Sequence, residues 1–316
     1  MNANPKYSYM PHLTLEMPVP QFATYTSENN QPMSIAFDTV GNPANPPMIL
    51  IMGLGKQLTS WNDQFCKAFA EAGFWIIRTD HRDVGLSSHF DAYRPSRFHI
   101  ASSHLFNRPL GAAYTLSEMG HDILAVMDHL KIKDAHIFGA SMGGMIGQHL
   151  AIEHPHRVKS LISVMSTTGN LKLPRARLDV RVRLLRSSPL TLQPFLEQTF
   201  KMARMLAGPV YVPDEEMVKA LAARNFSRAH NPFGGRRHLG AVIASGDRSQ
   251  LLTKVTTPTL VIHGTRDPLI PVECGMHTAK MIPDAKLELI PDMGHDVPYL
   301  LWPKIIDTTT EFCKSI

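Results

Sequence analysis

The sequence has few cysteines and no long hydrophobic run, and each scarcity narrows the classes of protein it can encode. Its three cysteines, Cys66, Cys274 and Cys313, lie far apart without a Cys-x-x-Cys pair, so neither a disulfide framework nor a zinc site is expected. Three cysteines without an expected disulfide favour a reducing compartment. The densest apolar run, residues 48–54, has strand length and falls well short of the roughly 20 residues that span a bilayer. We therefore expect no membrane span.

The N-terminus and the charge balance add two further expectations. Residues 1–21 contain four prolines and lack the basic-then-apolar pattern of a secretory signal, so we interpret them as an N-terminal extension of a cytoplasmic protein. The 32 basic residues exceed the 27 acidic ones by five, and part of this excess lies between Arg175 and Arg186. That stretch lacks the interleaved aromatic residues of a nucleic-acid-binding segment, so no nucleic-acid partner is expected.

Short aliphatic or β-branched runs alternate with longer amphipathic ones along the chain. The runs expected to be strands are residues 22–26, 33–40, 48–52, 75–79, 135–138, 161–165, 259–263 and 287–290. Between some of them, apolar residues recur at helical spacing over 61–72, 117–130 and 142–154. Strands separated by helices need crossover connections, which predicts an α/β fold with a mostly parallel eight-stranded sheet flanked by helices. The first two strands are expected to form an antiparallel hairpin.

The alternation of strands and helices stops between residues 170 and 253. This stretch shows helical patterns, over 192–207 and 214–224, and no strand pattern. Strand-like runs return after Pro258. We interpret residues 170–253 as a helical cap, and the flanking segments as one core. The segments predicted to form that core are residues 22–169 and 254–316.

The motif Gly139-Ala140-Ser141-Met142-Gly143-Gly144 lies between an expected strand and an expected helix. This is the context that a G-x-S-x-G nucleophile elbow requires. A serine on so sharp a turn has a strained backbone, and Gly139 and Gly143 leave room for strand and helix to approach closely. The alternative is a helix start that contains small residues by chance. The motif predicts that Ser141 is a nucleophile.

A serine hydroxyl needs a base, and the base needs an acid that orients it. Asp267 directly follows the expected strand 259–263, and His295 lies in the loop after the last strand. The order Ser, Asp, His places all three on loops at the same edge of a parallel sheet, which predicts the triad Ser141, Asp267 and His295. The carboxylates that compete with Asp267 for the acid role are Asp247, Asp284, Asp292 and Asp296.

Most of the remaining histidines are better explained by structural roles, whereas the loops that carry His81, His89, His99 and His104 could bring them close to the site. His136 and His263 lie in expected strands and should be buried. His121 is expected on a solvated helix face, and His154 at a helix end. His99 and His104 have no carboxylate or cysteine at ligand spacing, so no metal is expected.

A tetrahedral intermediate also needs amide donors for its negatively charged oxygen. The backbone amide of Met142, directly after the expected nucleophile, should be one donor. The glycines of Met52-Gly53-Leu54-Gly55 let the chain turn close to a substrate, and Leu54 is the second expected donor. The alternative for this segment is a plain glycine turn.

Over roughly residues 22–312 the chain resembles the α/β-hydrolase superfamily, and it looks closest to the esterase-like group that includes aclacinomycin methylesterase and related carboxylesterases. The resemblance rests on Met52–Gly55, on Asp80-His81-Arg82-Asp83-Val84-Gly85-Leu86-Ser87, on the elbow, on His263–Asp267 and on Gly294-His295. It implies that Leu54 is an oxyanion donor, although Met52 replaces the family's usual histidine. It also implies that the segment 80–87 is structural. The loop 89–113 is longer than this resemblance leads us to expect.

These observations predict a carboxylesterase that acts through an acyl-enzyme on small to medium apolar esters, without a cofactor. An acyltransferase or perhydrolase would use the same triad. An aminopeptidase would need an acidic amine pocket, which the arginine-rich cap does not indicate. A non-catalytic ligand-binding protein of the same fold is a further alternative.

Overall fold

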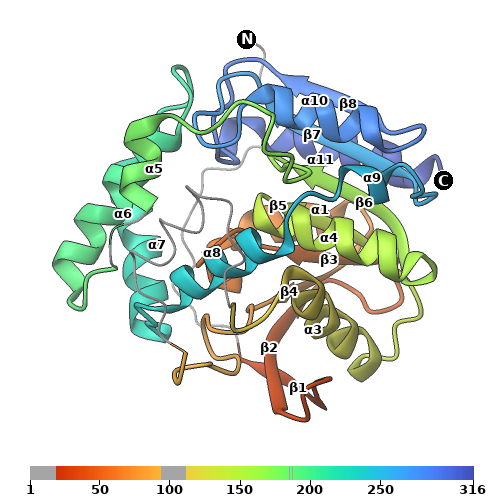
Figure 1. The fold of residues 1–316 in the computed structure, drawn as a ribbon, viewed down its shortest axis with the longest axis horizontal. Coiled ribbons are helices and arrows are strands. Elements are labelled where there is room, and N and C mark those ends of the chain that lie inside the picture. Colours follow the sequence, from red (N-terminus) through yellow and green to blue (C-terminus); the bar gives the residue numbers. More distant parts are fainter. Residues whose placement is uncertain (1–18, 94–111, 185, 187) are drawn as a thin grey trace.

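A computed structural model describes residues 19–93, 112–184, 186 and 188–316 of the chain. An eight-stranded sheet with the order β1-β2-β4-β3-β5-β6-β7-β8 runs through the molecule (Figure 1). The strands are β1 (Gln21–Thr26), β2 (Pro32–Val40), β3 (Pro47–Ile51), β4 (Trp75–Thr79), β5 (Ala135–Ala140), β6 (Val158–Val164), β7 (Thr259–Gly264) and β8 (Lys286–Ile290). The pairs β1–β2 and β2–β4 are antiparallel, and the other neighbouring pairs are parallel. The predicted fold class is confirmed, including the first hairpin.

Helices cover the sheet on both faces and bury apolar side chains against it. One buried cluster joins the sheet to α3 and α4, and a second joins it to α1 and α11. Outside the segment between β6 and β7, the helices are α1 (Asp63–Glu71), α3 (Leu116–His129), α4 (Met142–Glu153), α10 (Val272–Met281) and α11 (Trp302–Lys314), with short 3-10 turns at Leu58–Ser60, Pro155–Arg157 and Tyr299–Leu301. Local signals set the boundaries: Thr115 and Glu118 form a capping box at the start of α3.

The largest boundary difference from the sequence-based strands occurs at β6. This strand begins at Val158, three residues before the predicted start at residue 161. Polar Lys159 and Ser160 hid its beginning, because they interrupt the apolar run. Ser160 is nevertheless buried, and its hydroxyl is 2.7 Å from Nδ1 of buried His136 on β5. The pairing of these two polar groups makes their burial tolerable.

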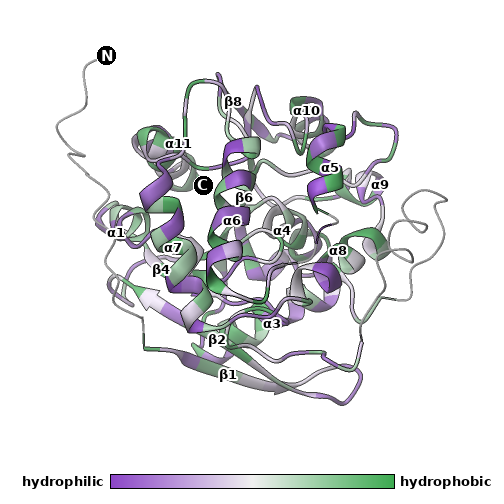
Figure 2. Ribbon diagram, turned by 90° about the vertical axis from the view of Figure 1, so that its left-hand side faces the viewer, coloured by the Kyte–Doolittle hydropathy of each residue, from purple (hydrophilic) through white to green (hydrophobic). Residues whose placement is uncertain are grey.

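The segment between β6 and β7 (residues 165–258), here called the β6–β7 segment, is helical and contains no strand in its described part. Its helices are α5 (Leu178–Leu184), α6 (Leu192–Leu206), α7 (Glu215–Arg228), α8 (Gly234–Ser245) and α9 (Ser249–Leu252). Helices α5, α6 and α7 lie to one side of the sheet (Figure 1). Figure 2 shows hydrophilic and hydrophobic residues alternating along α6, which packs against α7. Helix α9 instead contacts α4 and α10. The predicted cap boundaries, 170–253, stay predictions.

Two expectations fall wholly or mostly on residues that the structure does not describe. The predicted N-terminal extension, 1–21, overlaps the described residues only from residue 19, and residues 94–111 of the expected long loop also lie outside them. In the described ranges, none of the helices combines the length and apolar character needed to cross a bilayer.

Candidate functional site

Ser141 occupies the sharp turn between β5 and α4. Its backbone angles, φ 56° and ψ −117°, lie outside the ordinary regions for a residue with a side chain. The turn closes only because its neighbours are small: a Cβ at Gly139 would collide with the backbone of Gly143, and one at Gly143 with the carbonyl of Ile51. The Ser166 hydroxyl donates a hydrogen bond to the Ser141 carbonyl at 2.8 Å, which braces the strained residue.

Three side chains from separate loops converge at this turn. Nε2 of His295 lies 3.0 Å from Oγ of Ser141, and Nδ1 of His295 lies 2.7 Å from Oδ2 of Asp267. A carboxylate only accepts hydrogen bonds, so Nδ1 carries the ring proton and Nε2 is left as an acceptor facing the serine hydroxyl. The structure thus brings the three predicted residues together in one chain of hydrogen bonds.

Asp267 is fixed by a second set of contacts. Its Oδ1 accepts hydrogen bonds from the backbone amides of Leu269 and Ile270, both at 2.8 Å, and its side chain is fully buried. The carboxylate therefore cannot rotate without losing charge-assisted bonds. Of the competing carboxylates, Asp292 lies 3.7 Å from Arg266 and Asp247 accepts from Ser249.

The loop that carries His295 is held by the β6–β7 segment. The backbone amide of His295 donates a hydrogen bond to the carbonyl of Leu206, the last residue of α6, at 2.8 Å. The chain packs so closely here that a Cβ on Gly208 would meet the carbonyl of Asp292. This support was not visible in the sequence, because it uses only backbone atoms of residues far apart along the chain.

The segment Met52–Gly55 borders Ser141. A Cβ on Gly53 would lie 3.4 Å from Cβ of Ser141, so the backbone of this segment lies directly beside the serine. Two buried imidazoles anchor the segment: Nε2 of His81 lies 2.7 Å from the carbonyl of Met52, and the Gly55 amide donates to Nδ1 of His238 at 3.0 Å. His238, on α8, is a positioning residue that sequence reasoning missed.

Burial keeps His238 neutral and directs its hydrogen bonds. Nδ1 accepts from Gly55, so Nε2 carries the proton and donates to the carbonyl of Arg82 at 2.8 Å. Burial, with the nearby His81, lowers the pKa of His238 to about 3. A neutral ring is the form that this donor-and-acceptor arrangement requires.

A second buried histidine lies beside Asp267. His263, expected to be structural, is fully buried, and its Nε2 lies 2.8 Å from the carbonyl of Ile270 and 3.6 Å from Oδ2 of Asp267. Burial lowers the pKa of this imidazole. Its contact with Ile270 supports the turn whose amides hold Asp267.

The carboxyl group of Asp296, directly after His295, has no hydrogen-bond partner for its buried Oδ1 among the described residues. Burial raises its pKa to about 7, and the negative charge of Asp267 adds to this rise, while His295 opposes it. Asp296 is therefore largely protonated in mildly acidic solution, which keeps a second negative charge away from Asp267 and His295.

The predicted structural segment Asp80–Ser87 is an anchor for the β6–β7 segment. Oδ1 of Asp80 accepts from the amide of Leu58, and its Oδ2 pairs with Arg228 of α7 at 2.7 Å. Likewise Arg237 of α8 pairs with Asp83 at 2.7 Å. These ion pairs are buried, so removing one partner would leave an uncompensated charge.

One group of described side chains has the composition of a metal-ligand set. Potential ligand atoms of His121, Glu153 and His154 lie within 4.8 Å of one another. Glu153 ends α4 whereas Ser141 precedes it, so the helix separates the two by about 18 Å at the usual rise per residue. Sequence spacing did not predict this group, because His121 comes from α3. It contributes nothing to the site around Ser141.

The chain belongs to the alpha/beta hydrolase fold family, which it matches over residues 46–300. It is 28% identical over 292 residues to the rhodomycin D methylesterase DnrP of Streptomyces peucetius, covering 85% of this chain and 91% of that protein. It is 29% identical to the 3-oxoadipate enol-lactonase 2 of Acinetobacter baylyi, covering 82% and 86% of the two chains. The predicted resemblance is confirmed.

Solved structures show the same fold. The esterase RhEst1 from Rhodococcus sp. ECU1013 superposes with a TM-score of 0.70 at 20% identity, covering 93% of this chain and 98% of that one. The enol-lactonase from Burkholderia xenovorans LB400 gives a TM-score of 0.68 at 20% identity, with 92% and 99% coverage. At this identity the likeness concerns the fold alone.

Proposed function

We propose that this protein is a serine hydrolase that cleaves carboxylic esters through an acyl-enzyme. The observation that carries the proposal is the position of His295, with one ring nitrogen 2.7 Å from Asp267 and the other 3.0 Å from Ser141. This arrangement lets a neutral imidazole remove a hydroxyl proton while a fixed carboxylate stabilises the resulting positive charge.

In the first half-reaction, Oγ of Ser141 forms a bond to the ester carbonyl carbon and its proton passes to Nε2 of His295. The backbone amides of Met142 and Leu54 donate to the carbonyl oxygen as it becomes negative. Met142 is the first residue of α4, where helix amides have no partner within the helix. The intermediate collapses, the bond to the leaving oxygen breaks, and His295 gives its proton to the departing alcohol.

In the second half-reaction, water attacks the acyl carbon and gives a proton to His295. The bond to Oγ then breaks, and Ser141 recovers its proton from the imidazole. The products are a carboxylic acid and an alcohol, and neither step needs a cofactor. An alcohol or peroxide that replaced this water would turn the same acyl-enzyme into an acyltransferase or a perhydrolase.

The substrate class is supported by the relatives. The names of DnrP and of the Acinetobacter protein describe a methylesterase and an enol-lactonase, both of which hydrolyse carboxylic esters. We assign the same bond type to this chain and expect a small to medium substrate. We also infer that α5–α8 act as a cap, supported by the Leu206 contact to His295 and by the Arg228 ion pair to Asp80.

The test uses a p-nitrophenyl ester series and a fluorophosphonate probe. We expect steady-state hydrolysis by the wild-type protein, covalent labelling at Ser141, and loss of both in Ser141→Ala. Ser315→Ala, at an exposed serine near the C-terminus, is the matched control and should keep both. Activity that survives Ser141→Ala in a folded protein would refute the proposal.

Steady-state assays with added alcohol or hydrogen peroxide separate the possible acyl acceptors. Carboxylic acid as the main product supports a hydrolase. Transfer to the added nucleophile in preference to water would replace that assignment with acyl transfer. Labelling of Ser141 without turnover of any ester in the series would instead favour a ligand-binding role.

A further inference from the structure

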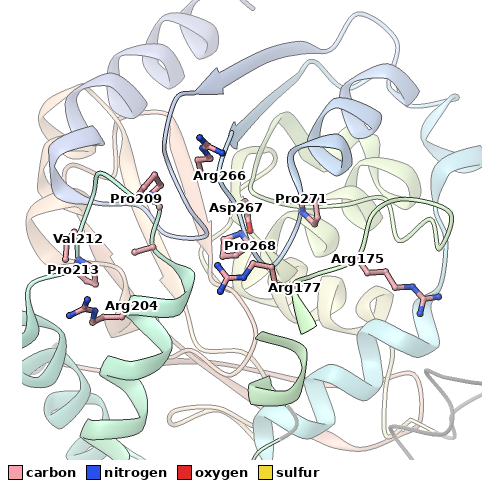
Figure 3. Close-up of a pocket in the computed structure, with 12 residues that line it drawn as sticks. Arg175, Arg177, Arg204, Pro209, Val212, Pro213, Arg266, Asp267, Pro268 and Pro271 are labelled. Atoms are coloured by element: carbon pink, nitrogen blue, oxygen red, sulfur yellow. The ribbon is translucent and has the colours of Figure 1, made fainter. Parts of the chain in front are cut away.

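A cavity of about 750 Å³ lies beside Asp267, between the β6–β7 segment and the turn after β7 (Figure 3). Its volume is within the range of small-molecule sites. Four arginines line it, Arg175, Arg177, Arg204 and Arg266. Figure 3 shows Arg177 beside Pro268 and Asp267, and Arg204 on the other side of the cavity, beside Val212 and Pro213.

The charge of this lining is only partly balanced. Arg177 pairs with Asp179 at 2.6 Å, but both side chains are at least half exposed, and such pairs contribute little. Arg266 lies 3.7 Å from Asp292, also at the surface. Within the described part of the chain, Arg175 and Arg204 have no acidic partner. The cavity therefore attracts anions.

Asp267 does not cancel this charge inside the cavity. Its side chain is fully buried, and both of its oxygens accept hydrogen bonds, from His295 and from two backbone amides. The side opposite Asp267 carries Pro209, Val212 and Pro213 together with Arg204 (Figure 3). Guanidinium groups next to apolar side chains suit a ligand with an acidic group on a hydrocarbon body.

The cavity is also joined to the triad through the backbone. The amide of Arg177 donates to the carbonyl of Pro268, the residue after Asp267, at 2.9 Å. Ala207, which follows the Leu206 carbonyl that holds His295, lines the cavity as well. A molecule bound here would touch the loop that carries Asp267 and the start of the chain after α6, whose Leu206 carbonyl holds the amide of His295.

We propose that this cavity binds the carboxylate end of an ester substrate, so that the preferred substrates are half-esters of dicarboxylic acids. The inference rests on the proposed ester hydrolysis. It narrows that function from apolar esters to esters with a second, anionic group at a distance set by the hydrocarbon chain.

The test compares p-nitrophenyl half-esters of succinic, adipic and suberic acids with neutral p-nitrophenyl alkanoates of matched length. We expect kcat/KM to favour the charged member of at least one pair. This preference should fall about tenfold in Arg204→Gln and about tenfold in Arg177→Gln, because each loses one close charge contact. It should also shrink as salt is raised to about 1 M, where the screening length is only about 3 Å.

Lys172→Gln is the matched control, since Lys172 is exposed in the same segment and does not line the cavity. It removes one positive charge and should keep the preference. Equal kcat/KM for the charged and neutral members of every pair would overturn the inference while leaving ester hydrolysis intact. The inference would also fail if Lys172→Gln lost as much of the preference for charged esters as Arg204→Gln.

If the wild-type protein hydrolyses none of these esters, the proposed function fails, and the cavity is then tested by calorimetric titration with suberate alone. Binding that weakens about a hundredfold in the Arg177→Gln and Arg204→Gln double variant supports an organic-anion site. Failure of suberate to bind the wild-type protein would overturn it.

Discussion

Replacing Asp267 by Asn should abolish activity through a change of tautomer, with little change in the fold. Oδ1 of Asp267 accepts two backbone amides, so the oxygen of the new carboxamide must take that position. Its NH2 group then faces Nδ1 of His295, in place of Oδ2. A donor there forces Nδ1 to accept, which moves the ring proton to Nε2, opposite Ser141.

A protonated Nε2 cannot remove the serine proton, so we expect kcat to fall by about 10⁴, or roughly 5 kcal/mol in activation free energy. The hydrogen-bond count is preserved, so the free energy of unfolding should change little. The assay is kcat and KM on a p-nitrophenyl ester, with urea denaturation alongside. Asp292→Asn is the control, because the Asp292 side chain is partly exposed, lies near His295 in the sequence and makes a surface ion pair with Arg266 at 3.7 Å. More than a tenth of wild-type turnover in folded Asp267→Asn would refute the tautomer argument.

Two further predictions concern stability and pH. Gly143→Ala should lower the free energy of unfolding by about 1–3 kcal/mol, measured by urea denaturation, because the new Cβ would collide with the backbone carbonyl of Ile51. Gly235→Ala is the control and should not lower it, because the nearest atom would lie 3.7 Å from the new Cβ. Asp296 has its folded-state pKa raised to about 7 from 3.8, so the folded protein binds more protons than the unfolded chain between these values, and its stability should fall as pH rises through them. Asp296→Asn should remove this pH dependence, which amounts to at most about 4 kcal/mol in the free energy of unfolding between pH 4 and pH 7. If the free energy of unfolding depends on pH equally in the variant, Asp296 is not the group responsible.

The strands were predictable because their pattern depends on burial alone. Parallel strands covered on both faces read as continuous apolar runs, and β5 and β7 are buried at every position. The same regularity made the convergence of three side chains predictable. When strands run in parallel, the loops after β5, β7 and β8 share one edge, so Ser141, Asp267 and His295 could be expected close together from their order along the chain.

The contacts that support the site could not be predicted in this way. Helix α8 begins with Gly234 and Gly235, residues that favour turns over helices, so it was missed together with His238. The hydrogen bond from the His295 amide to the Leu206 carbonyl joins two backbone groups, so no particular side chain indicates it in the sequence. Such contacts depend on how the β6–β7 segment folds back, which periodicity does not determine.

The carbonyl of Leu206 has one further consequence for how the molecule works. A displacement of the C-terminal end of α6 would stretch or break the bond to the amide of His295. The position of this helix end and the orientation of the imidazole are therefore coupled. If α6 acts as part of a cap, as proposed above, a ligand that holds this helix in place would also hold His295 against Ser141.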